Sequence, residues 1–213
     1  MVDDIQKLHI RKIPLKESPR RIAYASSHRA FAVCLTNVVM TEDGAESKDR
    51  VAFFDHPTFE EMDSFALDPY EQGLACAACE FEGAEYLVVG TGYVIPGEDE
   101  PCRGRVLVFT LNSNRRCELV TAKEVRGAIY SLCPFNGKLV AGIGSKVQLF
   151  RWADRADGVP ELQTECGHHG HILVLFLRTQ GDLIIVGDIM RSIVVLQYKA
   201  AGRNIEEVRY KHK

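Results

Sequence analysis

The sequence contains no uninterrupted apolar run approaching the roughly 20 residues that a membrane-spanning helix needs. Its first residues, MVDDIQKLHIRK, lack the apolar stretch of a secretory signal. The formal net charge is only −3, which gives no broad basic surface to attract a phosphate backbone. These absences predict a soluble protein of the nucleus and cytoplasm.

A disulfide framework is also missing. The seven cysteines are scattered, and an odd number without a secretory signal indicates reduced thiols. Cys76 and Cys79 have the spacing of redox and zinc sites, but no second pair accompanies them. In an extended strand these two side chains would point to opposite faces. We therefore interpret both as packed thiols.

Motifs for catalysis or phosphate binding are absent as well. Gly90-Thr-Gly92 and Gly142-Ile-Gly144 lack the lysine and the helix start of a phosphate loop, and no serine elbow is present. His168, His169 and His171 could bind zinc or copper, but no fourth ligand lies at motif spacing. A structural or solvent-exposed role is the favoured alternative for them. The sequence thus predicts no enzyme, no cofactor and no metal site.

What the sequence does contain is a repeat. Three segments share a turn glycine, an apolar run, a second glycine, a polar turn with a basic residue, and another apolar run. They are EGAEYLVVGTGYV with GRVLVFTL, NGKLVAGIGSKVQLFRW, and QGDLIIVGDIMRSIVVLQY. A similar apolar run precedes each segment and a more polar run follows it, which gives four short strands per unit.

Four strands in every roughly 40–50 residues is the spacing of propeller blades. We predict an all-β, single-domain fold over 1–213, a partial β-propeller of about four four-stranded antiparallel, WD-repeat-like blades. The expected blades span approximately 21–67, 74–125, 128–165 and 171–210, and 7–15 is expected to be an outer strand of a preceding blade. A blade cannot bury its flat faces alone, so we expect a fragment of a larger propeller or an arc closed by another segment.

Two insertions, at 40–49 and 91–104, are longer than hairpins need and are expected to form loops. The innermost strands, which include 21–24, 128–131 and 173–176, would open onto the rim of the channel. Aromatic and small residues there could form a pocket for a partner helix, or could simply fill the blade interfaces. The pattern alone leaves both interpretations open.

Basic pairs at Arg20-Arg21 and Arg115-Arg116, and the tail at 211–213, could touch nucleic acid. They lie at separate blade positions without interleaved aromatic residues, and the chain is acidic overall. We interpret them as solvated loop charges, which leaves contact with nucleic acid weak or indirect.

Several segments, in order, resemble one known family. They are DDIQKLHIR, PLKESPRRI, KEVRGAIYS, FNGKLVAGI, HILVLFL and GDLIIVGDIMRSIVVLQYK. They resemble part of the third propeller in the family of the large subunit of the damaged-DNA-binding protein, the adaptor of cullin-4 ubiquitin ligases. Propeller subunits of mRNA cleavage and splicing complexes belong to the same superfamily.

The resemblance implies a non-catalytic adaptor segment of a cullin-RING E3 ubiquitin ligase, linked to the DNA damage response. It would dock helical segments of substrate receptors, and a propeller missing from this sequence would hold the cullin. The resemblance places receptor contacts at Arg11, Glu17, Ala128, Tyr130, Ser131, Leu173, Leu175, Phe176 and Arg191. The alternative function is a nucleic-acid-binding propeller subunit of mRNA cleavage or splicing complexes.

Overall fold

The computed structural model describes residues 12–41, 44–155 and 158–208, and all regular structure in these residues is β-strand. The described residues contain no helix that could cross a membrane. The first sheet contains β1 (Ser18–Ala25), β2 (Ala30–Thr41), β3 (Gly44–Asp55) and β4 (Glu61–Ala66). The second contains β5 (Glu71–Phe81), β6 (Ala84–Tyr93), β7 (Arg103–Leu111) and β8 (Cys117–Arg126).

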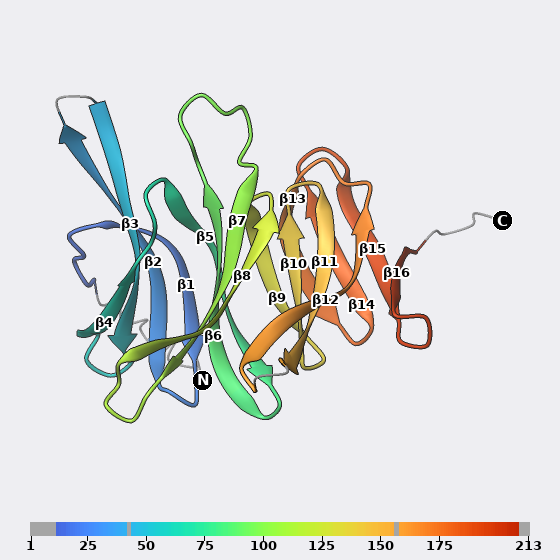
Figure 1. Ribbon diagram of the computed structural model, residues 1–213, viewed down its shortest axis with the longest axis horizontal. Helices are drawn as coiled ribbons and strands as arrows, with labels where there is room; N and C mark the ends of the chain where they lie inside the picture. Colours follow the sequence, from blue (N-terminus) through green and yellow to red (C-terminus); the bar gives the residue numbers. More distant parts are fainter. Residues whose placement is uncertain (1–11, 42–43, 156–157, 209–213) are drawn as a thin grey trace, which may run out of the picture.

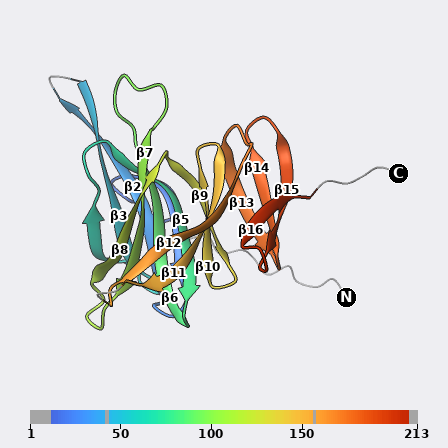
Figure 2. The ribbon, with the colours of Figure 1, turned by 45° about the vertical axis from the view of Figure 1, so that its right-hand side comes forward.

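The third sheet contains β9 (Ile129–Phe135), β10 (Lys138–Ile143), β11 (Lys146–Asp154) and β12 (Pro160–His169). The fourth contains β13 (Val174–Gln180), β14 (Leu183–Asp188), β15 (Ser192–Lys199) and β16 (Asn204–Glu207). Within each sheet the strands are antiparallel and follow chain order. The four sheets stand side by side in the order of the sequence (Figures 1 and 2). The prediction of an all-β partial propeller is confirmed.

The sheets are arranged as blades around an axis. Their first strands, β1, β5, β9 and β13, pack closely on one another, whereas their fourth strands make far fewer contacts. A separate core cluster of Val, Ile, Leu and Phe side chains fills each gap between successive sheets. Strands buried on both faces need near-continuous apolar sequence, which explains the apolar runs of the repeat.

Glycines of the repeat let neighbouring blades approach each other. A Cβ on Gly90 of β6 would lie 2.5 Å from Cγ2 of Ile129, the first residue of β9. A Cβ on Gly142 of β10 would lie 2.4 Å from Cγ1 of Val174, the first residue of β13. The second strand of one sheet thus provides a space for a β-branched side chain of the next sheet.

Between the first and second sheets this arrangement is reversed. Here the second strand supplies the larger residue, and the first strand of the next sheet supplies the glycine. Cys34 occupies the glycine position of β2, and Gly73 of β5 replaces the β-branched residue. A Cβ on Gly73 would lie 2.8 Å from the Cys34 sulfur. Each interface therefore holds one small and one larger residue, whichever sheet supplies them.

We expect Gly142→Ala to lower the free energy of unfolding by about 1–3 kcal/mol, because the new methyl group overpacks the interface with Val174. Urea unfolding measures this change. Adding Val174→Ala should recover part of the loss. Gly187→Ala is the matched control, since Gly187 holds the same position in the fourth sheet and faces only the exposed Phe176 ring. Equal losses from Gly142→Ala and Gly187→Ala would contradict this account of the repeat.

Some predicted boundaries need correction. The insertion at 40–49 is wrong as a loop, because β2 and β3 continue through it and pair as far as Thr41 with Gly44. A paired hairpin satisfies backbone groups that a loop would leave to solvent. The second insertion is a loop only over 94–102. Of the outer strand expected at 7–15, residues 7–11 lie outside the described part, and 12–15 form no strand.

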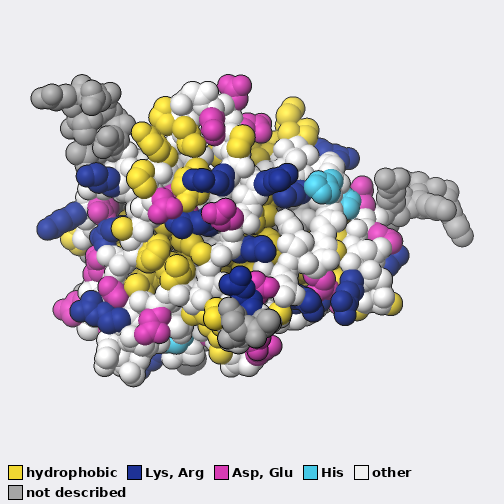
Figure 3. Space-filling model, in the orientation of Figure 1, with side chains coloured by type: hydrophobic (Ala, Val, Ile, Leu, Met, Phe, Trp, Pro, Cys, Tyr) yellow, Lys and Arg dark blue, Asp and Glu magenta, His cyan; other side chains and the backbone are white. Residues whose placement is uncertain are grey.

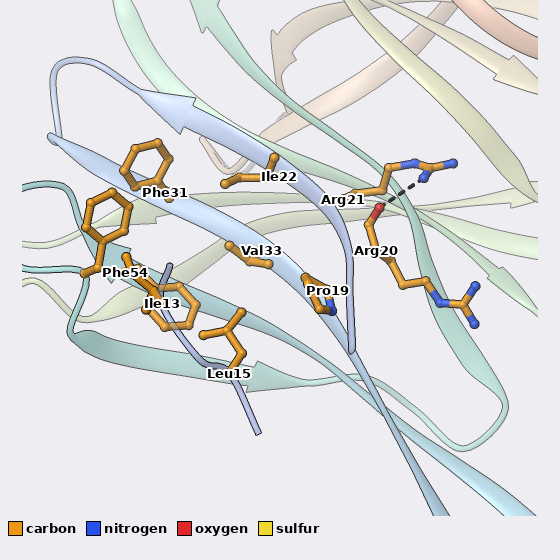
Figure 4. A pocket seen from close by; sticks show the side chains of 10 residues that line it. Ile13, Leu15, Pro19, Arg20, Arg21, Ile22, Phe31, Val33 and Phe54 are labelled. Carbon is orange, nitrogen blue, oxygen red and sulfur yellow. Dashed lines mark hydrogen bonds between the residues drawn. The ribbon is translucent and has the colours of Figure 1, made fainter. Parts of the chain in front are cut away.

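The two outermost sheets present apolar faces. The outward face of the first sheet holds a groove of ≈ 570 Å³. Figure 4 shows that Ile13, Leu15, Ile22, Phe31 and Phe54 line it. The outward face of the fourth sheet carries the exposed side chains of Phe176 and Ile193. Exposed apolar end faces are the expected result when an arc of blades does not close on itself.

Candidate functional site

The structure gathers most of the predicted contact residues at one end of two neighbouring sheets. This is the end at which β5, β9 and β13 begin, the top in Figure 1, and we call it the upper end. The gathered residues, here named the rim residues, are Tyr130, Ser131, Leu173, Leu175, Phe176 and Arg191. The backbone N–H of Leu177 on β13 donates to the Ser131 hydroxyl on β9 at 3.0 Å, which fixes the two strands together.

Apolar side chains dominate this part of the upper end. Phe176 is 70% exposed, while Leu173 and Leu175 are half-buried. Four more exposed side chains surround them and were not predicted from the sequence: Ile172, Ile189, Met190 and Ile193. The sequence signal for them was Ile-Met within the turn after Asp188, where polar residues are usual. Together they place several apolar side chains at the upper end of the fourth sheet.

Asp188 holds the two turns that carry this surface. Its buried carboxylate accepts hydrogen bonds from the backbone N–H groups of Ile172 (2.7 Å), Leu173 (3.3 Å), Met190 (2.9 Å) and Arg191 (2.9 Å). Burial alone would raise the pKa of Asp188, but these four donors lower it to about 2. The carboxylate therefore stabilises the fold at neutral pH, and this contribution is lost as the pH falls from about 4 towards 2.

The polar groups of the rim are few. Burial, followed by the charge of Glu100, raises the pKa of Tyr130, so its hydroxyl stays protonated and can donate a hydrogen bond. The guanidinium of Arg191 donates to the carbonyl of Gly170 and remains exposed. The arrangement can bind an apolar partner surface and orient it with one hydroxyl and one cation.

Two predicted contact residues are not part of the rim, and a third lies outside the described residues. Ala128 is buried against Gly92 between the second and third sheets, so its side chain is closed to solvent. Glu17 pairs with Arg50 at 2.7 Å on the first sheet, at the other end of the row of sheets. Arg11 lies outside the described residues. Neither Ala128 nor Glu17 therefore contributes its side chain to the surface formed by the rim residues.

The histidines pack beside the rim. The rings of His168 and His171 lie 5.4 Å apart, and Nδ1 of His171 lies 3.8 Å from the Asp188 carboxylate. Burial lowers the pKa of both imidazoles, which favours their neutral forms. Within the described ranges, no group of three His, Cys, Asp or Glu side chains is arranged to hold a metal ion.

The cysteine interpretation agrees with the packing. Cys76 packs against the core between the first two sheets, and Cys79 belongs to the core between the second and third. Burial raises the pKa of Cys79 to about 12, so its thiolate, the reactive form, is disfavoured.

Side chains of the basic pairs form ion pairs and hydrogen bonds with other groups of the same chain. Arg115 pairs with Asp55 at 2.6 Å and Arg116 with Asp63 at 3.4 Å. The Arg21 guanidinium donates to the carbonyl of Leu74 at 2.8 Å. On the face seen in Figure 3, Lys and Arg side chains are interspersed with acidic and apolar ones. No continuous basic groove for a nucleic acid is visible on that face.

A buried ion pair fixes the upper end of the second sheet. The Glu71 carboxylate, with a side chain 0% exposed, accepts from Arg105 Nε at 2.8 Å and from the Thr91 hydroxyl at 2.6 Å. Asp68 lies 3.1 Å from Arg105 and accepts from the Tyr93 hydroxyl at 2.7 Å. The hydrogen bond to Glu71 is the main cause of a raised pKa at Arg105, so the guanidinium stays charged.

Residues 48–209 match the family described as the CPSF A subunit region. The chain is also similar to DNA damage-binding protein 1 of Oryza sativa subsp. japonica, with 48% identity over 209 residues. It is 49% identical over 211 residues to DNA damage-binding protein 1b of Arabidopsis thaliana and 47% identical over 211 residues to DNA damage-binding protein 1 of Solanum lycopersicum. Each match covers 97% of this chain but only 19% of the relative's length.

Proposed function

Since the chain belongs to the family of the CPSF A subunit region, we propose that it is a non-catalytic scaffold segment that docks helical segments of substrate receptors. The scaffold is the adaptor of a cullin-RING ubiquitin ligase that acts in the nucleus and cytoplasm and serves the DNA damage response. The observation that carries the proposal is the apolar surface formed by the rim residues and their neighbours on the fourth sheet.

The chemistry of this surface suits an amphipathic helix. Leu173 and Met190 offer apolar contact on backbone that Asp188 holds in place, and Phe176 lies on a strand paired with β14, so little ordering cost is added on binding. A helix presents apolar anchors at intervals of three and four residues, which can reach such neighbouring side chains together. The Tyr130 hydroxyl and the Arg191 guanidinium can then fix the orientation of the helix.

Contact with the cullin belongs to a different propeller in this proposal. The chain spans about a fifth of the length of its curated relatives, and receptor binding would also use parts of the protein beyond this segment. The experiment is affinity purification of a tagged copy with crosslinking and mass spectrometry. Crosslinks from the rim to a helix of WD-repeat receptors, without cullin, are expected. Crosslinks to cleavage, polyadenylation or splicing subunits instead would replace the proposal with a role in RNA processing.

The proposal also predicts weak direct affinity for DNA and RNA, because the net charge is −3 and Arg115 and Arg116 are paired within the fold. Fluorescence anisotropy with labelled oligonucleotides measures this between about 50 and 200 mM salt, the range over which phosphate contacts lose affinity steeply. Flat or absent binding is expected. A steep salt dependence would favour the nucleic-acid-binding alternative.

A further inference from the structure

A second hollow lies at the upper end, between the first and second sheets. It has a volume of ≈ 680 Å³. Its walls include the apolar side chains of Val38, Leu67 and Val94 and the half-exposed ring of Tyr70. Asp49 of β3 also lines it. The hollow is thus largely apolar, with Asp49 and Asp68, the latter paired with Arg105, among its walls.

The Asp49 carboxylate has no partner. The residue is 6% exposed, and neither side-chain oxygen has a hydrogen-bond partner anywhere in the described structure. Burial raises the pKa of Asp49, although Thr36 and Arg20 offset part of the effect. A buried carboxylate without a compensating donor is costly, so its presence needs an explanation.

Strand alternation explains where this carboxylate points. Val51 and Phe53 belong to the core between the first two sheets, and Asp49 shares their face of β3. Arg50 lies on the other face, where it pairs with Glu17. Lys48 lines the hollow but alternates with Asp49 along the strand, and among the described residues no ion pair joins the two.

The neighbouring carboxylate of Glu71 has the cationic partner that Asp49 lacks. Glu71 lies in the same layer between the same two sheets and is fully buried, but Arg105 and Thr91 satisfy its oxygens. Arg105 thus pairs directly with Glu71, whereas Arg20, whose charge lowers the pKa of Asp49, donates to the Thr36 hydroxyl at 3.4 Å and forms no ion pair with Asp49. A guanidinium from outside the chain could pair with the Asp49 carboxylate as Arg105 pairs with the Glu71 carboxylate.

We propose that this hollow binds an arginine side chain of a protein partner. The guanidinium pairs with the Asp49 carboxylate, the methylene stem lies along Val38 and Leu67, and the Tyr70 ring packs on the planar cation. Arginine fits better than lysine because its flat, weakly hydrated fork matches a carboxylate with two hydrogen bonds and stacks on aromatic rings. The site lies on the first two sheets, apart from the rim, and does not depend on the function proposed for the rim.

The test is an NMR titration of the full chain with N-acetyl-L-arginine amide, with the neutral citrulline analogue as the comparison. Saturable shifts of the Val38, Leu67 and Tyr70 amides are expected with the arginine probe, and at least tenfold weaker binding with the citrulline probe. Asp49→Asn should abolish the response. Glu80→Gln, which removes an exposed carboxylate at the other end of the second sheet, should retain it. Equal responses to both probes, or unchanged binding by Asp49→Asn, would overturn the proposal.

Thermal unfolding separates this role from a structural one. If the Asp49 carboxylate is unpaired in the free protein, Asp49→Asn removes an unpaired buried charge and should raise the unfolding midpoint. The expected rise is about 2–4 °C for each kcal/mol of stability gained in a chain of this size. A lower midpoint would mean that the carboxylate supports the fold and would count against the proposal. Tyr70→Ala, at an exposed ring, should weaken arginine binding while leaving the midpoint unchanged.

Discussion

Replacing Phe176 by aspartate in a full-length family protein that carries this segment is expected to lower its affinity for a receptor helix more than about 100-fold. Phe176 is the most exposed of the apolar rim residues in this segment, so the change should leave the folding of the segment intact. In the complex, the helix would bury a carboxylate within an apolar contact, which costs about 3 kcal/mol or more. Leu173→Asp should act in the same direction. Calorimetry or surface plasmon resonance with a purified receptor measures the loss.

Leu183→Asp provides the control for this experiment. Leu183 is 36% exposed and lies in the same sheet, at the opposite end from the rim. The same charge is introduced there without touching the proposed helix site, so affinity should stay within about threefold of wild type, as for surface changes of about 0.5 kcal/mol. A comparable loss in Leu183→Asp and Phe176→Asp would show a general charge effect, and undiminished binding by Phe176→Asp would remove the rim from the interface.

Arg105→Met is expected to cost about 3–5 kcal/mol of unfolding free energy, the largest loss of stability that we predict. The substitution keeps most of the apolar stem but leaves the Glu71 carboxylate fully buried without its cation. Asp68 would also lose its contact with Arg105, although it is half-exposed and can be hydrated. Urea unfolding, followed by circular dichroism, gives the change in free energy.

Two further variants test the cause of this loss. Glu71→Leu combined with Arg105→Met removes both charges, and the double variant should be clearly more stable than Arg105→Met alone. Arg116→Met breaks the largely exposed ion pair with Asp63 and should cost less than about 1 kcal/mol. If the double variant were as unstable as Arg105→Met, lost packing rather than an unpaired charge would be the cause.

The repeat could be found in the sequence because each unit uses the same packing device. Gly90, Gly142 and Gly187 recur before the polar turn, since the second strand of each sheet needs a small residue at this equivalent position. The first unit departs from this pattern, because Cys34 takes the glycine position and Gly73 provides the compensating space. The sequence shows the glycines but not the side chains that fill the spaces beside them.

The candidate sites were less predictable because they depend on contacts between distant residues. The rim residues of β13 followed from the resemblance, but the exposure of Met190 depends on two turns that Asp188 joins. The sequence predicts a loop at 40–49, and only the continuation of β3 turns the Asp49 side chain into the layer between two sheets. The sequence predicts strands well here, but it does not show whether a buried carboxylate has a partner.

The difference between the two outermost faces gives the row of sheets a direction. One outermost face carries the exposed side chains of Phe176 and Ile193, and the other holds the groove around Ile13 and Phe54, so the two faces are different in shape. An isologous contact joins the same patch of two copies, so a contact that joins one of these faces to the other face of a second copy is not isologous. Contact between two such arcs through these faces is heterologous, and a heterologous contact either closes into a ring or continues as a filament. Covering one face is therefore enough to prevent chain growth, because every link in a filament needs both faces.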